Sequence, residues 1–364
     1  MRTGTARLPL HTGKAPHWLF SRMVRLAREI VRHLVEEHGP EEVLRRLSDP
    51  FWFQALGCVL GFDWHSSGVT TTTCGAVKEG IKGLEGELGL FAAGGKGRAS
   101  RRTPREIEAG CEATGLDAAP LVYASRMAAK VDSAAVQDGY QIYHHAFFFT
   151  EGGRWCVVQQ GMDETVGMAR RYHWLGEGVG DFVCEPHAAV CCDRRGAPLN
   201  LVARESGEVR GASAALARRP SEEVVRLAAR LPELELPRRH RVSTADVNPR
   251  HLKKILLRTY ERAPEDFEAL LGIEGVGAKT LRALALVSEL VYGARASARD
   301  PARFGFAHGG KDGTPYPVDR STYERTVEIL HRALDRSRVD RTDKVRAFRR
   351  LAAFEGARGG STAR

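Results

Sequence analysis

The fold is decided by residues 271–284, which read LGIEGVGAKTLRAL. Gly275 and Gly277 flank Val276 in this stretch. Glycine adopts backbone angles that are closed to other residues, so the Gly-Val-Gly unit predicts a tight turn. A run of helix-forming residues follows from residue 279 to residue 290. The stretch therefore predicts a helix, a tight hairpin and a second helix.

The turn at the start of the second helix predicts an anion site. The first N–H groups of a helix have no intrahelical partner, and the helix dipole is positive at that end. Lys279 and Arg282 add full positive charges on the first turn. A phosphate diester fits this combination, and the residues predicted to contact DNA there are Gly275, Val276, Gly277, Ala278, Lys279, Thr280 and Arg282.

The hairpin resembles the helix-hairpin-helix motif of DNA repair proteins. Its sequence GVGAKT, at residues 275–280, is similar to the hairpin of endonuclease III-type DNA glycosylases. In that family the lysine is a Schiff-base nucleophile, and an aspartate in a later Val-Asp pair assists it. The resemblance implies these catalytic roles for Lys279 and for Asp319, which follows Val318.

The chain departs from the glycosylase pattern around that aspartate. The separation of 40 residues between Lys279 and Asp319 is longer than is usual in the family, and Arg320-Ser321 replaces the Thr-His that commonly follows. No cysteine lies beyond Cys192, so we expect no iron–sulfur cluster. The alternative is that Lys279 binds a phosphate and Asp319 caps a helix.

Most of the chain also resembles domain-of-unknown-function family 763, in which an N-terminal region is joined to such a hairpin. This resemblance implies an arrangement but no activity. The predicted fold class is α+β. We expect a mixed α/β domain, a helix with a basic linker, a helical domain that carries the hairpin, and a disordered tail, at residues 1–210, 211–242, 243–356 and 357–364 respectively.

The composition is that of a globular protein with an acidic partner. The chain has 364 residues, of which 43% are hydrophobic and 27% charged, and its net charge is +10. Such a charge favours a polyanion, although an Arg-rich surface alone would produce it. No apolar run reaches the roughly 18 residues of a membrane span. Seven cysteines, an odd number, indicate reduced thiols and a cytoplasmic location. A homo-oligomer is compatible with these features.

The clearest β signal lies in the N-terminal part. Residues 140–149 are aromatic and β-favouring, residues 151–153 are a Glu-Gly-Gly turn, and residues 155–160 form the returning strand. A helix is expected over residues 125–132, just before this hairpin. Acids, imidazoles and amides therefore gather around a strand pair.

This gathering predicts a second catalytic centre. Asp132, His144, Glu185 and His187 are ligand types that could hold Mg²⁺ or Mn²⁺ and so activate water for phosphodiester cleavage. Lys130 is expected to stabilise the transition state, and Gln159 belongs to the same catalytic set. The alternative for each residue is a structural role. Zinc is the less favoured metal, because the nearby Cys184, Cys191 and Cys192 lie in apolar runs that are typical of a core.

Two basic segments lie outside the hairpin. Residues 94–105 predict a mobile loop that either follows a phosphate backbone or is a plain surface linker. In the second segment Arg170 and Arg171 precede Tyr172 and Trp174. These arginines are expected to bind phosphate while an aromatic ring stacks on a base. A helix with one buried aromatic face is the alternative.

Three hypotheses on function follow. The favoured one is a metal-dependent DNA nuclease active in repair, whose N-terminal domain cuts DNA that the hairpin delivers. The second is a glycosylase or abasic-site lyase that uses Lys279 and Asp319. The third is a non-catalytic nucleic-acid binder. In all three, the hairpin holds single- or double-stranded DNA without reading its sequence.

Overall fold

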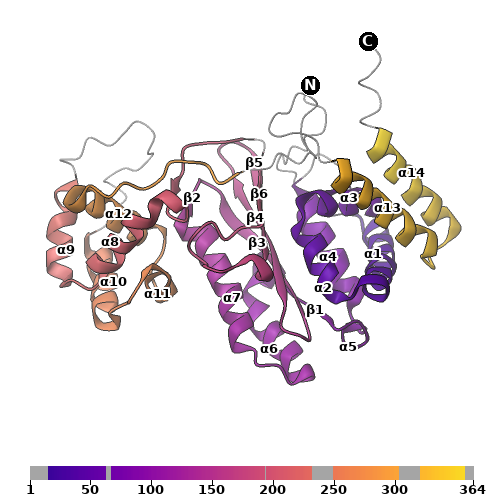
Figure 1. The fold of residues 1–364 in the computed structure, drawn as a ribbon, viewed down its shortest axis with the longest axis horizontal. Coiled ribbons are helices and arrows are strands. Elements are labelled where there is room, and N and C mark those ends of the chain that lie inside the picture. Colours follow the sequence, from indigo (N-terminus) through magenta and orange to yellow (C-terminus); the bar gives the residue numbers. More distant parts are fainter. Residues whose placement is uncertain (1–14, 63–66, 193, 232–248, 303–319, 357–364) are drawn as a thin grey trace, which may run out of the picture.

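The computed structural model describes residues 15–62, 67–192, 194–231, 249–302 and 320–356. A central antiparallel sheet separates two sets of helices, as Figure 1 shows, and the helices that carry the hairpin lie at the end of the molecule. The chain is therefore α+β, as the sequence predicts. None of the described helices is both long and apolar enough to span a bilayer.

The main sheet has five strands in the order β1-β3-β4-β5-β6, and all neighbouring strands are antiparallel. The predicted hairpin is confirmed, since β3 pairs with β4. A small second sheet joins β2 to β7. The strands are β1 (Leu90–Lys96), β2 (Val136–Gln137), β3 (Gln141–Thr150), β4 (Trp155–Asp163), β5 (Met168–Leu175), β6 (Ala189–Cys191) and β7 (Leu199–Asn200).

Each face of the main sheet packs on its own helices because successive side chains of a strand point to opposite faces. Phe147 and Phe149 enter the core formed with α6 (Thr103–Thr114) and α7 (Ala119–Lys130). Phe148 enters the core formed with four N-terminal helices. These are α1 (His17–His38), α2 (Pro40–Ser48), α3 (Pro50–Leu60) and α4 (Gly68–Ile81), and the short α5 (Glu85–Leu88) leads from them to β1.

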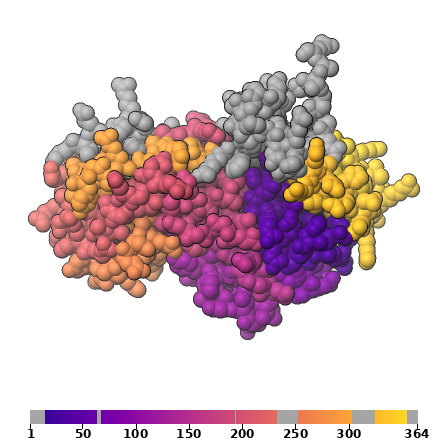
Figure 2. Space-filling view, in the orientation of Figure 1, coloured from indigo at the N-terminus to yellow at the C-terminus, as the bar shows by residue number. Residues whose placement is uncertain are grey.

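The hairpin belongs to a helical unit that shares its core with the α6–α7 face of the sheet. Leu270, Leu271 and Val276 are buried in that common core. The unit contains α8 (Gly207–Ala217), α9 (Ser221–Ala228), α10 (Pro249–Arg262), α11 (Phe267–Gly272) and α12 (Ala278–Tyr292). Figure 2 shows that its atoms continue without a break into those of the sheet region.

The last two helices differ from the predicted domain division. The structure places α13 (Arg320–Arg336) and α14 (Arg341–Gly356) against α1 and α3 rather than beside the hairpin. Leu330, Leu334 and Leu351 are buried in the core of the N-terminal helices. A single helical domain over residues 243–356 is therefore not how this chain packs. An amphipathic helix needs an apolar surface to cover, and its sequence does not say which one.

Candidate functional site

Residues 267–292 form a helix, a turn and a second helix in the structure. Asp266 caps α11 by accepting a hydrogen bond from Ala269 N at 2.8 Å. At the turn Gly275 has a φ of 88°, which favours glycine, and a Cβ there would lie 2.7 Å from Ile255 Cδ1. Val276 is only 3% exposed. The buried side chain of Val276, between Gly275 and Gly277, therefore anchors the turn in the core.

Two side chains from the sheet domain hold this turn from the inside. Lys130 Nζ donates to Leu271 O at 2.5 Å and to Ile273 O at 2.7 Å. Gln137 Nε2 donates to Ala278 O at 2.8 Å, while its Oε1 accepts from Arg282 Nε at 2.8 Å. Burial lowers the pKa of Lys130. The ammonium expected to stabilise a transition state is therefore engaged by the carbonyl groups of the hairpin.

The other side of the turn presents the start of α12. Gly277 occupies the N-cap position, where it has no side chain to bond the first N–H groups of the helix. Lys279 is exposed, whereas the side chain of Thr280 is buried. Among the predicted DNA contacts, Val276 and Thr280 can thus take part through their backbone only. Asp319, the predicted partner of Lys279, lies outside the described residues.

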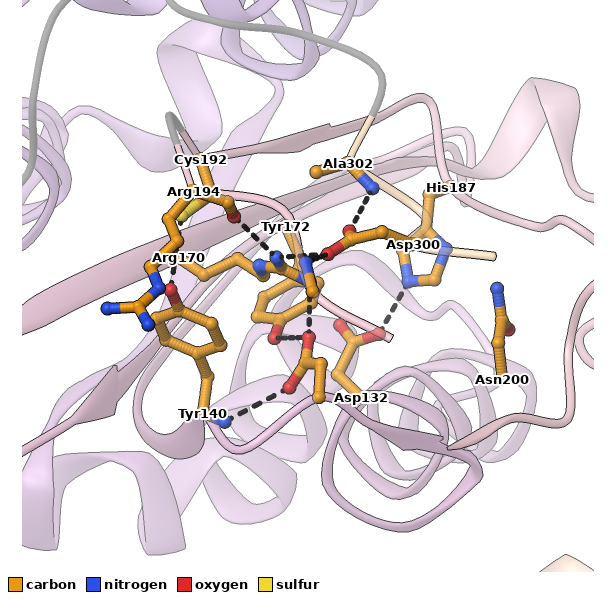
Figure 3. Close-up of polar contacts among 12 residues, drawn as sticks. Asp132, Tyr140, Arg170, Tyr172, His187, Cys192, Arg194, Asn200, Asp300 and Ala302 are labelled. Atoms are coloured by element: carbon orange, nitrogen blue, oxygen red, sulfur yellow. Dashed lines mark hydrogen bonds and ion pairs between the residues drawn. The ribbon is translucent and has the colours of Figure 1, made fainter. Parts of the chain in front are cut away.

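A buried carboxylate lies two residues beyond Lys130. Asp132 is fully buried in a π-helical turn, η2 (Val131–Ala135), at the end of α7. Its Oδ2 accepts from Gln159 Nε2 at 2.5 Å and from Trp174 Nε1 at 2.9 Å. Its Oδ1 lies 2.5 Å from His187 Nε2, the contact drawn in Figure 3.

The bond to Asp132 sets the state of His187. Because a carboxylate can only accept, His187 Nε2 is the donor in this bond, and Nδ1 is the ring nitrogen that does not contact Asp132. The ring packs 4.6 Å from that of Trp174 and 6.0 Å from that of Tyr172, measured between centroids. The side chain of His187 is 6% exposed. Orientation by a carboxylate prepares an imidazole for general acid–base catalysis.

The network continues into the core on the other side of Gln159. Gln159 Oε1 lies 2.7 Å from His145 Nδ1, and His145 Nε2 lies 2.9 Å from Ser125 Oγ. Burial lowers the pKa of His145, so the ring is neutral and Ser125 donates to it. The chain of bonds from Ser125 to His187 fixes the position of Asp132.

His144 and Glu185 do not join this centre. His144 follows the strand alternation to the opposite face, where both of its ring nitrogens lack a hydrogen-bond partner. Burial, with smaller contributions from His145 and Lys96, lowers its pKa to about 3. Glu185 adopts a φ of 49° and contacts Arg299 Nη2 at 2.5 Å. Within the described residues no three His, Cys, Asp or Glu side chains are arranged to hold a metal, so the four predicted ligands do not form one set.

Among the described residues, the cysteines near His187 form no disulfide. Cys191 and Cys192 are buried, and Cys192 Sγ lies 3.3 Å from Tyr140 Oη. His187 is bonded to Asp132 instead.

Residues 4–318 match the family model described as Protein of unknown function (DUF763). The chain belongs to the DUF763 family. Comparisons with curated proteins and with solved structures gave no match.

Two residues predicted to bind DNA are buried in this DUF763 member. Arg170 and Arg171 lie in β5, a strand rather than the helix considered as the alternative, and are 1% and 0% exposed. Arg170 forms an ion pair of 2.8 Å with Asp138. It forms a second ion pair, of 2.9 Å, with Asp300 (Figure 3). Arg171 donates to His173 Nε2 at 2.9 Å. The prediction that these arginines contact DNA is wrong, because both faces of β5 are covered. Arg170 meets Asp138 and Asp300 on one face, and Arg171 meets Gln54 of α3 on the other.

The sequence predicted only some of the residues in the Asp132 network. Asp132, Gln159 and His187 were predicted site residues, and they do meet. Trp174 and Ser125 were missed as members of the network. An available signal for Trp174 was the period of two in β5, which places residue 174 on the same face as Tyr172.

Proposed function

We propose that this DUF763 member binds DNA through the start of α12 and hydrolyses phosphodiester bonds at the Asp132–His187 pair. The main support for this proposal is the pair of hydrogen bonds from Lys130 to the hairpin carbonyl groups, because Lys130 lies only two residues before Asp132. It joins an exposed basic helix start to an oriented imidazole through one short segment. The net charge of +10 supports a polyanionic substrate.

The proposed chemistry is general acid–base catalysis. His187 Nδ1 removes a proton from water as the water oxygen attacks phosphorus, and the bridging oxygen leaves with the electrons of the broken P–O bond. The resulting imidazolium is stabilised by Asp132, which is held by Gln159 and Trp174. The proton then passes to the leaving oxygen or to solvent. Each atom in the step comes from water, substrate or this pair.

Mg²⁺ or Mn²⁺ fits this centre less well than proton transfer does. Both oxygens of Asp132 already face N–H groups, and the nitrogen of His187 nearest to them is one of those donors. A hard divalent cation prefers several oxygen ligands, which this set does not offer. Cleavage that survives EDTA supports the pair alone. Loss in EDTA with recovery in Mn²⁺ would instead support a metal-dependent nuclease.

Catalysis is tested with labelled single- and double-stranded DNA. His187→Ala and Asp132→Asn are expected to lower the cleavage rate about 10²–10⁴-fold, the usual contribution of a positioned acid–base group. His331→Ala, at an exposed histidine on α13, is the matched control and should cut like the parent. Unchanged cleavage by His187→Ala would overturn the assignment.

DNA binding is tested at the start of α12. Gly277→Asp adds a good N-cap residue, so the helix should remain formed while the carboxylate repels phosphate. Lys279→Ala should lower the salt dependence of binding by about one phosphate contact, a slope change of about 0.9. Lys82→Ala, at a lysine that is 73% exposed beyond α4, is the control. Parental affinity in both hairpin variants would refute the interface.

The other two hypotheses are outcomes of the same experiments. If borohydride traps an abasic duplex on the parent protein but not on Lys279→Ala, the result would support a lyase instead of catalysis by the Asp132–His187 pair. Salt-dependent binding without any cleavage would leave a non-catalytic binder. Free thiols and a nucleic-acid substrate favour the cytoplasm as the proposed location.

A further inference from the structure

A second cluster of exposed cations lies between β1 and α6. We call it the arginine turn, and it comprises the 3₁₀ turn η1 (Gly97–Arg102) with its flanks. Its exposed basic residues are Lys96, Arg98, Arg101, Arg102 and Arg105. Neither the hairpin nor the Asp132–His187 pair involves them.

The arginine turn is held in one conformation, unlike the mobile loop that its glycines predict. Gly94 has a φ of 84°, and a Cβ there would lie 2.2 Å from His145 O, so glycine is required. Lys78 Nζ bonds Gly94 O at 2.9 Å. Thr103 Oγ1 donates to Ser100 O at 2.7 Å. Cations on a rigid turn lose little side-chain and backbone freedom when a ligand binds.

The nearby acid does not neutralise this turn. Glu106 Oε2 bonds Lys78 Nζ at 2.6 Å and Gly94 N at 2.8 Å, and its other oxygen reaches Arg102 at only 3.6 Å. Lys96, Arg98, Arg101 and Arg105 form no ion pair within the described ranges. The turn also leads into the positive end of α6, which repels its charges. A bound polyanion would relieve the repulsion among these cations and the repulsion between them and the positive end of α6.

Topology brings the arginine turn to the same end of a helix pair as the hairpin. α6 and α7 pack side by side and are joined by the short segment 115–118, so they run antiparallel. The arginine turn precedes the start of α6, and Lys130, which holds the hairpin, ends α7. Asp132 follows at that same end. Packed helices are about 8–10 Å apart, which is well within the reach of one DNA segment.

We propose that the arginine turn is a second anchor for the phosphate backbone of the same DNA that the hairpin holds. The DNA then spans from the start of α12 to the arginine turn and passes the end of α7 where Asp132 lies. The inference rests on the proposed DNA binding and adds the path of the substrate. It also explains why unpaired cations are kept on a stiff turn next to a helix N-terminus.

The test compares two triple variants that remove the same charge. Arg98→Ala, Arg101→Ala and Arg105→Ala together remove three cations from the arginine turn and its flank. The control variant, Arg325→Ala with Arg341→Ala and Arg349→Ala, removes three exposed cations from α13 and α14. These two helices pack on the N-terminal helices, on the side of the sheet away from α6 and α7. Affinity for a labelled mixed-sequence duplex and a labelled single strand is measured over a range of salt concentrations. Thermal unfolding confirms that both proteins are folded.

The expected result is specific to the arginine turn. Its triple variant should lower the slope of log affinity against log salt by about 2–3 on duplex DNA, whereas the control variant should match the parent. If both triple variants behave alike while Gly277→Asp loses binding, the second anchor is refuted and the hairpin interface stands. If Gly277→Asp and Lys279→Ala also bind like the parent, the proposed function itself fails. Loss of binding to the single strand alone would refute a duplex path.

Discussion

Neighbouring residues of one strand have different electrostatic surroundings on the two faces of the central sheet. Arg170 lies with the carboxylates of Asp138 and Asp300, and although burial alone would lower its pKa, these partners raise it well above the usual value. Its neighbour Arg171 points to the N-terminal helices, where it donates to neutral groups such as Gln54 Oε1, and burial lowers its pKa to about 10. Consecutive arginines of one strand therefore differ in electrostatic environment.

The same contrast separates two adjacent histidines of β3. His145 is bonded to Ser125 and Gln159 and thereby belongs to the Asp132 network. His144 is buried on the opposite face with both ring nitrogens unpartnered. The face toward α7 thus holds the Asp132 network and the side chain of Lys130, which contacts the hairpin. The comparison teaches that neighbouring residues of one strand join different networks, and substitutions on the two faces should differ in their effects accordingly.

The largest expected loss of stability comes from substitution of Asp138. Asp138→Ala leaves Arg170 with one of its two carboxylates and removes the bond from Tyr172 Oη, 2.7 Å long. Breaking a buried ion pair from one side costs about 3–5 kcal/mol in free energy of unfolding, to be measured in urea. Arg45→Ala breaks the half-exposed pair with Glu177 and should cost no more than about 1 kcal/mol. Equal losses in the two variants would contradict the contrast.

An intermediate effect is expected at the link to the hairpin. Lys130→Met keeps the length of the side chain but removes the donors to Leu271 O and Ile273 O. Carbonyls left unpaired in a partly buried site cost about 1–3 kcal/mol. Hydrogen exchange should therefore speed up at the hairpin amides, and DNA affinity should fall. Lys253→Met, at an exposed lysine of α10, controls for the lost charge. Hairpin exchange as slow as in the parent would show that this link is dispensable.

The smallest effect at neutral pH is expected from His144. His144→Leu removes a ring without hydrogen bonds, so stability at pH 7 should change by less than about 1 kcal/mol. His145→Leu breaks two bonds and should cost about 1–3 kcal/mol. A greater loss in His144→Leu than in His145→Leu would reverse the assignment of the two faces.

His144 also predicts a pH dependence of stability. Its pKa falls from 6.5 in the unfolded chain to about 3 in the folded protein, so the unfolded chain binds the extra proton between these values. Stability should accordingly decrease as pH falls through this window, with a contribution of up to about 1.4 kcal/mol per pH unit. Unfolding measured across the window should show a shallower slope in His144→Leu. An unchanged slope would exclude this histidine as the source.

Local chemistry was enough to predict the β3–β4 strand pair and the turn before α12. The strand pair around residues 151–153 is as expected, because β-favouring residues surround a Glu-Gly-Gly turn. The turn at Gly275 and the start of α12 follow from the two glycines and the helix formers beyond them. Each of these features depends on residues within one or two turns of chain, and such information is present in the sequence.

The sequence determined the α+β class, the antiparallel hairpin of strands, the helix–turn–helix with its basic start, and the excess of positive charge. Only the tertiary structure decided that α13 and α14 cover the N-terminal helices and that Arg170 is interior. It alone brought Asp132 to His187, 55 residues apart, and sent His144 to the other face. The reason is physical: backbone propensities act between near neighbours, whereas burial and pairing depend on which distant surfaces meet.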